Sequence, residues 1–177
     1  SLGVTVGLAL QGSLSNLAAG IVILVTRPFR VGDKISSESA TGIVENITIM
    51  YTYINTSTNE LVCIPNSDLT TDKLTNFTAK PTRRLDLNFG VAYTKDYKRA
   101  KDVILGCVAE NGKCLEDPAP AVVLAEQAAS SLVFTLKVWT KTEDYDDVKA
   151  DLMERVTDAL IAANVEIPYN QLDVHIK

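Results

Sequence analysis

The first 26 residues of the chain, Ser1 to Thr26, contain no charged side chain, and charges begin abruptly at Arg27. A helix rises about 1.5 Å per residue, so this run would extend about 39 Å, more than the roughly 30 Å hydrocarbon core of a bilayer. We therefore predict a membrane-spanning helix at the start of the chain, followed by a water-soluble body.

The same run is unusually rich in small and polar side chains. Small residues let helices approach one another closely in a bilayer. Amide and hydroxyl side chains are poorly placed against lipid, and the run contains Gln11, Ser13, Ser15 and Asn16. The composition predicts a helix that packs against copies of itself around a wet interior.

Gly12 is predicted to divide the run into two helical stretches, Ser1 to Gln11 and Ser13 to Val25. Glycine costs about 1 kcal/mol relative to alanine in a helix interior and often marks a bend. Ser13 is a candidate N-cap for the second stretch, and Pro28 ends it. Apolar residues recur at helical spacing in that stretch: Leu14, Leu17, Ile21 and Leu24.

Charge and cysteine content narrow the class of protein. The net charge is −5, which disfavours a nucleic-acid partner, and the three cysteines have no CxxC spacing. We expect reduced, buried thiols and no metal site. Arg27, Arg30 and Lys34 follow the apolar run, and basic residues close to a membrane end favour the cytoplasmic side. The chain begins inside an apolar run, so we interpret it as the C-terminal part of a longer membrane protein.

Period-two patterns predict a small, mostly antiparallel β domain over residues 28–80. Ile47, Ile49, Tyr51 and Tyr53 alternate with more polar residues, and a polar turn separates them from a strand ending at Ile64. Short strands at this spacing suit a compact barrel.

Residues 81–170 are predicted to form an α+β domain in the order β-α-β-β-α-β, the ferredoxin-like arrangement. The second helix shows the clearest pattern, with apolar residues every four positions at Val148, Leu152, Val156 and Leu160. The last strand is predicted from Leu172 to Ile176, and we assign residues 171–177 to it.

Four motifs in this order resemble the small-conductance mechanosensitive channel family, MscS-like: Val6 to Gly20, Arg27 to Asp33, Ile64-Pro65-Asn66 and Gly90-Val91-Ala92-Tyr93. The resemblance covers essentially the whole chain. It implies a homoheptamer in the bacterial inner membrane that opens under membrane tension and releases ions and small osmolytes on hypo-osmotic shock.

The resemblance also implies an architecture. Residues 1–27 form the pore-lining helix and its amphipathic continuation, kinked near Gly12. An Sm-like β barrel, an α+β domain and a C-terminal strand of a seven-stranded barrel follow in the cytoplasm. Two further membrane helices are expected before Ser1, and no cofactor is needed.

The resemblance also implies roles for individual residues. The pore gate falls on Val4 and Leu8, whose i, i+4 spacing places them on one helix face. A narrow apolar ring of this kind excludes water and so blocks ions. The remaining roles are helix packing for Gly3, Gly7 and Ala9, hinges at Gly12 and Gly20, and a gating contact between Gln11, Asn16, Asn66 and Ser67. The sequence leaves two alternatives open: Val4 and Leu8 could face neighbouring helices, and the two hinge glycines could serve packing alone.

Two other functions fit the sequence less well. An Sm-like module could bind RNA, but residues 33–80 contain three lysines, no arginine and six acids. An enzyme would need a nucleophile with its base or a phosphate-binding loop, and the sequence has no GxSxG, Walker A or GxGxxG motif. Both are disfavoured relative to a channel.

Overall fold

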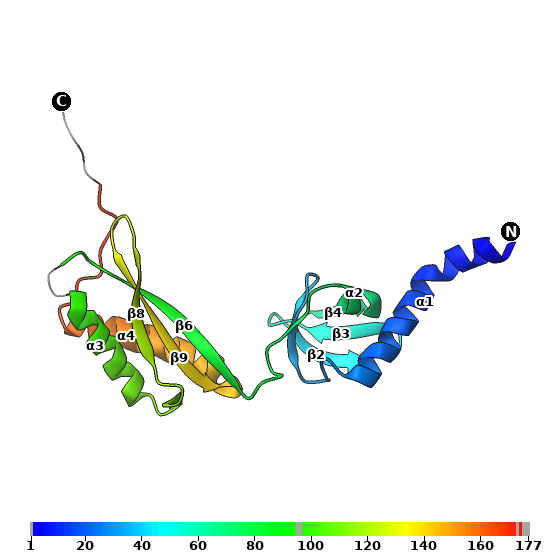
Figure 1. Ribbon diagram of the computed structural model, residues 1–177, viewed down its shortest axis with the longest axis horizontal. Coiled ribbons are helices and arrows are strands. Elements are labelled where there is room, and N and C mark those ends of the chain that lie inside the picture. Colours follow the sequence, from blue (N-terminus) through cyan, green and yellow to red (C-terminus); the bar gives the residue numbers. More distant parts are fainter. Residues whose placement is uncertain (1, 95–96, 173, 175–177) are drawn as a thin grey trace. The chain divides into compact units, whose positions relative to one another are not determined.

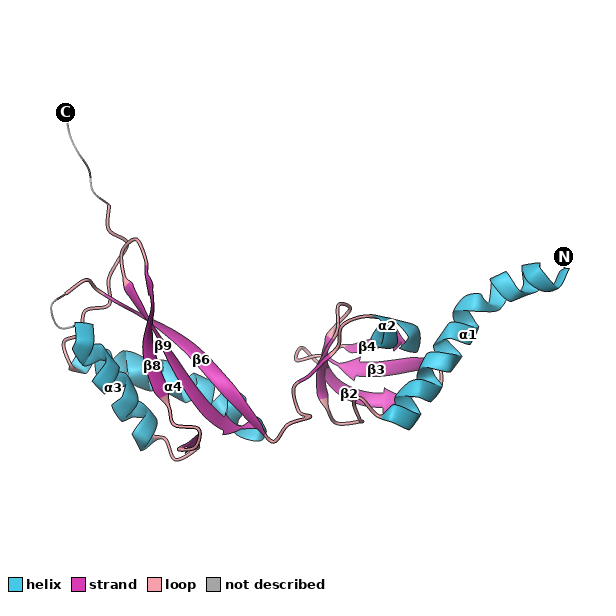
Figure 2. Cartoon of the chain, in the orientation of Figure 1, coloured by secondary structure: helices cyan, strands magenta, loops and turns pink. Residues whose placement is uncertain are grey.

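The computed structural model describes residues 2–94, 97–172 and 174 (Figure 1). The chain divides into two compact units, residues 1–80 and 81–177. Each unit has its own apolar core, and Figure 2 shows that both contain helices as well as strands.

The first unit begins with one long helix, α1 (Leu2–Thr26). Helical hydrogen bonding continues through Gly12, and Ser13 lies inside the helix, so the predicted division into two stretches and the Ser13 N-cap are wrong. Glycine keeps both of its backbone hydrogen-bonding groups, so it weakens a helix without ending it. Figure 1 shows the axis of α1 changing direction about midway along the helix.

A five-stranded antiparallel sheet follows α1, in the order β4-β3-β2-β1-β5. Its strands are β1 (Lys34–Ser36), β2 (Thr41–Ile47), β3 (Tyr51–Asn55), β4 (Leu61–Pro65) and β5 (Thr75–Asn76). A short helix that the sequence did not predict, α2 (Asn66–Thr71), connects β4 to β5. The buried core combines sheet residues such as Val44 and Ile54 with Ile23 from α1. Helix α1 therefore contributes to the core of the β domain.

The period-two pattern around Ile47 to Tyr53 misled the prediction. Residues 48–50 form the turn between β2 and β3, so the pattern crosses a hairpin. Tyr51 is exposed, whereas Thr52 is fully buried. The Thr52 hydroxyl donates to Asn66 Oδ1 at 2.8 Å, and this bond compensates for burying a polar group.

The second unit is built around one central strand. Its elements are β6 (Thr82–Val91), α3 (Tyr97–Glu110), β7 (Cys114–Leu115), β8 (Ala121–Gln127), β9 (Leu132–Lys141), a 3-10 turn (Thr142–Asp144) and α4 (Tyr145–Ala162). Strand β9 pairs antiparallel with β6 along its full length and also with β7 and β8. It therefore lies between β6 on one side and the other two strands on the other.

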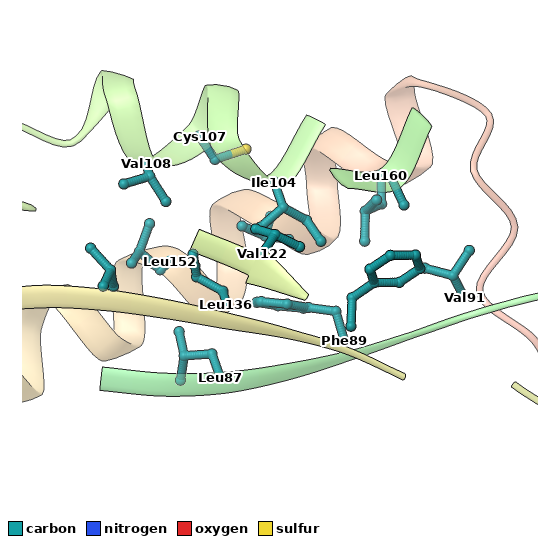
Figure 3. Packing of buried hydrophobic residues seen from close by; sticks show 14 of the residues in the cluster. Leu87, Phe89, Val91, Ile104, Cys107, Val108, Val122, Leu136, Leu152 and Leu160 are labelled. Carbon is teal, nitrogen blue, oxygen red and sulfur yellow. The ribbon is translucent and has the colours of Figure 1, made fainter. Parts of the chain in front are cut away.

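One apolar core fills the space between the sheet and the two helices (Figure 3). The predicted apolar face of α4 is confirmed, since Leu152 is 0% exposed, and Leu85 of β6 and Leu136 of β9 are at most 1% exposed. The expectation of buried thiols is partly wrong: Cys107 is buried and Cys114 half-buried, but Cys63 is exposed on β4.

The predicted C-terminal strand is not formed by the described residues of its range. Leu172 and Val174 are exposed and lie outside any strand, while Asp173 and residues 175–177 are outside the described part of the chain. A strand needs a neighbour to pair its backbone groups. The family resemblance implies a barrel in which the neighbouring strands would come from other copies.

Truncating the central strand should destabilise the second unit. Leu136 is 0% exposed in β9, so Leu136→Ala should lower the free energy of unfolding by about 2–5 kcal/mol. Val123 in β8 is 40% exposed, and Val123→Ala is the matched control with an expected loss below about 1 kcal/mol. Trp139 is the chain's only tryptophan and lies in β9, so its fluorescence during urea unfolding reports on this unit. Equal losses for the two variants would contradict the proposed core.

Candidate functional site

The N-terminal half of α1 presents an apolar surface with no partner in this chain. Every residue from Gly3 to Ser15 is exposed, including Val4 at 68% and Leu8 at 67%. Among the described residues, Gly3–Thr26 is the helical segment whose length and composition suit a membrane span. The predicted gate and packing positions therefore all lie on a surface available to lipid or to other copies.

The C-terminal half of the helix is attached to the β domain instead. Ala19, Gly20 and Ile23 are buried there, and all three lie on one helix face with Asn16. The large apolar residues that recur at helical spacing in the sequence do not face the β domain, since Leu14, Ile21 and Leu24 remain about half exposed. Small residues dock because they allow backbones to approach closely.

Gly20 marks the closest approach between α1 and the β domain. A Cβ atom added there would clash with the carbonyl oxygen of Ile49 in the β2–β3 turn and would lie 2.7 Å from Asn66 Nδ2. At Gly12, by contrast, an added Cβ would meet nothing within 4 Å. The structure thus gives Gly20 a packing reason to be glycine and gives Gly12 none within one chain.

Asn16 fixes the same face of α1 through a hydrogen bond. The backbone N–H of Ser67 donates to Asn16 Oδ1 at 2.9 Å. Ser67 lies in the first turn of α2, where backbone N–H groups lack helical partners, and Pro65 provides no side-chain cap. Asn16 thereby caps α2 from a different helix, so the predicted contact between Asn16 and Ser67 is present.

Asn66 organises the surface that receives α1. It is fully buried, and its Nδ2 donates to the carbonyl oxygen of Thr48 at 2.9 Å. Its Oδ1 accepts from Thr52, and its backbone N–H donates to the carbonyl of Met50 at 2.9 Å. These bonds hold the β2–β3 turn against the start of α2, which is the place where Gly20 packs.

The structure thus brings Asn16, Gly20, Asn66 and Ser67 together and leaves Gln11 exposed on α1. Sequence reasoning missed Ala19, Ile23 and the β2–β3 turn as parts of this contact. The adjacent small residues Ala18-Ala19-Gly20 were the available signal, because a run of small side chains suits close packing.

Charged residues in the second unit form ion pairs with one another. Lys113 Nζ lies 2.9 Å from Asp144 and 3.1 Å from Asp147, and Arg155 pairs with Asp151 at 2.9 Å. The Lys113 pairs connect the α3–β7 turn to the start of α4, whereas the Arg155–Asp151 pair lies within α4. In the ranges that the structure describes, no group of three or more His, Cys, Asp or Glu side chains is arranged to hold a metal ion.

The contrast between the two glycines gives a matched test. Gly20→Ala should push α1 away from the β2–β3 turn at a cost of about 1–3 kcal/mol, whereas Gly12→Ala should stabilise the helix by up to about 1 kcal/mol. The measurement is amide hydrogen exchange at Ser67, whose N–H bonds to Asn16. Exchange should accelerate in Gly20→Ala alone; unchanged exchange there would contradict the close approach.

Comparison with known proteins agrees with this architecture. Two family models match: the mechanosensitive ion channel beta-domain over residues 12–79, and the mechanosensitive ion channel MscS C-terminal domain over residues 85–167. The small-conductance mechanosensitive channel of Edwardsiella ictaluri (strain 93-146) is 41% identical across 98% of this chain and 61% of its own length. The channel of the same name from Helicobacter pylori (strain UM084) is 32% identical across 100% of this chain and 65% of its own length.

Solved structures show the same relationship. The closed-state crystal structure of Helicobacter pylori MscS matches with a TM-score of 0.93 at 32% identity, covering 99% of this chain and 70% of that one. Arabidopsis thaliana MSL1 shares the fold at a TM-score of 0.79 and 18% identity, covering 96% of this chain and 63% of that one. These matches confirm the resemblance predicted from the four motifs and favour a channel protein over an RNA-binding module or an enzyme. The chain belongs to the MscS family of mechanosensitive ion channels.

Proposed function

We propose that this chain is part of the pore-forming subunit of a channel that membrane tension opens, releasing ions and small osmolytes on hypo-osmotic shock. The chain spans 61%, 58% and 62% of the lengths of three curated relatives, so the proposal concerns a longer protein. Family membership supports it, and so do the printed names of the relatives from Edwardsiella and Helicobacter.

The observation that carries the proposal is the division of α1 into an exposed half and a docked half. The exposed half is uncharged, and Val4 and Leu8 lie one turn apart on it. In a ring of copies, these two side chains would form two stacked apolar constrictions. Such constrictions block ions by dewetting and conduct when the pore widens.

The docked half of α1 would stay fixed to the β domain while the exposed half moves during gating. Gly20 is packed against Ile49, so the helix cannot bend there without separating from the β domain. Gly12 has open space around it and lies near the midpoint of α1. We therefore propose Gly12 as the hinge, with Gly3, Gly7 and Ala9 allowing neighbouring helices to slide. Asn16, Asn66 and Ser67 would hold the helix end, and Gln11 would lie next to the bend.

The proposal extends to the oligomeric state, the membrane orientation and the folds of the domains. We propose a homoheptamer in the bacterial inner membrane with residues after about 27 in the cytoplasm, since Arg27 and Arg30 directly follow the apolar helix. The antiparallel sheet would be an Sm-like barrel. The second unit has β9 between β6 and β8, as a ferredoxin-like sheet requires, and residues 171–177 would pair with other copies in a barrel.

A polar substitution at the gate tests the function. Leu8→Ser should let water enter the constriction, so the full-length channel should conduct at tensions that leave the unmodified channel closed. Leu10→Ser is the matched control, because Leu10 is 50% exposed on α1 but two residues from Leu8 and therefore on a different helix face. Currents from excised patches under graded suction provide the measurement. An identical threshold for Leu8→Ser and the unmodified channel would count against Leu8 as the gate.

A further inference from the structure

Asn76 lies where three segments of the first unit meet. It ends β5, the edge strand that pairs with β1, and it directly precedes residues 77–80, which lead to the second unit. Both ends of its side-chain amide are used, and each end bonds to a different part of the chain.

The amide nitrogen of Asn76 reaches the end of the pore helix. Its Nδ2 donates to the carbonyl oxygen of Pro28 at 3.3 Å and to Asp33 Oδ2 at 2.8 Å. Pro28 follows α1 directly after Arg27. Asp33 Oδ2 also accepts from the backbone N–H of Arg30 at 2.9 Å, which closes the loop that leaves the helix.

Asp33 is held in its charged form in this arrangement. Burial raises the pKa of its carboxyl, but the hydrogen bonds from Asn76 and from the Arg30 backbone, together with the positive charge of Arg30, outweigh burial and lower the pKa below its ordinary value. An ionised carboxylate makes stronger hydrogen bonds than a neutral acceptor.

The amide oxygen of Asn76 holds the connector. Its Oδ1 accepts from the backbone N–H groups of Thr78 and Ala79, each at 3.0 Å, and from the Thr78 hydroxyl at 3.0 Å. Thr78 Oγ1 in turn accepts from the backbone N–H of Lys34 at 3.1 Å. The chain is therefore bound to the first unit as far as Ala79.

The first bond to the second unit follows directly along the chain. The carbonyl oxygen of Pro81 accepts from the backbone N–H of Thr142 at 2.8 Å, and β6 begins at Thr82. Only Lys80 separates the two attachments. The Pro81 ring fixes its own φ and restricts the residue before it to extended conformations, so the connector has little slack.

We propose that Asn76 is a coupling residue that fixes the connector to the end of α1, so that a displacement of the second unit acts on the helix end at Pro28. The gating part of this inference rests on the proposed channel function. A slack linker would absorb the same displacement, because its backbone could rotate without moving either unit.

Hydrogen exchange in the full-length protein tests the attachment. In Asn76→Ala, amides in a peptide covering residues 77–80 should exchange about tenfold faster, since Thr78 and Ala79 lose their acceptor. Amides of β3 should keep their rates, which shows that the sheet is intact. Asn46→Ala is the matched control, an exposed asparagine on β2 that should leave the connector unchanged.

A second variant covers the case in which Asn76→Ala does not fold. Thr78→Val keeps the side-chain shape but loses the hydroxyl that bonds Lys34 and Asn76, and it should accelerate exchange of the same peptide about threefold. Unchanged exchange in the folded variants would overturn the attachment.

Patch recordings test the coupling itself. Asn76→Ala should change the tension for half-maximal opening, or the decay of current under steady suction, by at least about twofold relative to Asn46→Ala. Faster exchange with unchanged gating would overturn the coupling role. An unmodified channel without tension-activated current would overturn the proposed function and with it any gating role for Asn76, while the exchange rates would still decide the attachment.

Discussion

The close approach of α1 to the β domain at Gly20 is the constraint on which the first unit depends. A helix that spans a membrane must be anchored if movements of the protein are to act on it. Here the anchor combines the contact of Gly20 with Ile49, the burial of Ile23 and the capping of α2 by Asn16. A side chain at position 20 would disrupt all three, because helix and turn could no longer meet.

This anchor divides one continuous helix into two parts with different surroundings. The docked part shares the core of a β domain, so its position follows the sheet. The other part is apolar and exposed, and none of the described residues of this chain covers it. Polar bonds at both ends of the sheet strengthen the division: Asn66 holds the turn that receives Gly20, and Asn76 binds the carbonyl of Pro28 just beyond the helix. The β domain therefore holds the C-terminal half of the helix in a fixed position relative to the sheet.

Much of this could be predicted from the sequence, and the errors have physical causes. The apolar face of α4 was predicted correctly because a buried helix face repeats apolar residues at the helical period. The β2–β3 turn was missed because its residues continue an alternating pattern, although Thr52 is the buried residue. Helix α2 was missed because its cap comes from Asn16, 51 positions away from Ser67 in the sequence, and local patterns do not report such contacts. The docking face of α1 was overlooked because it is built from small residues, whereas the large apolar side chains face outward.

We propose that the exposed half of α1 lines a pore that is narrowest at two apolar rings. The most direct test is a structure of the full-length oligomer in a lipid bilayer disc, with the pore radius measured along its axis. Symmetric copies of α1 should surround the axis, with Val4 and Leu8 at the narrowest point and the Gly20 face docked on the β domain. A structure in which Val4 and Leu8 face lipid or neighbouring helices, with the constriction elsewhere, would contradict it.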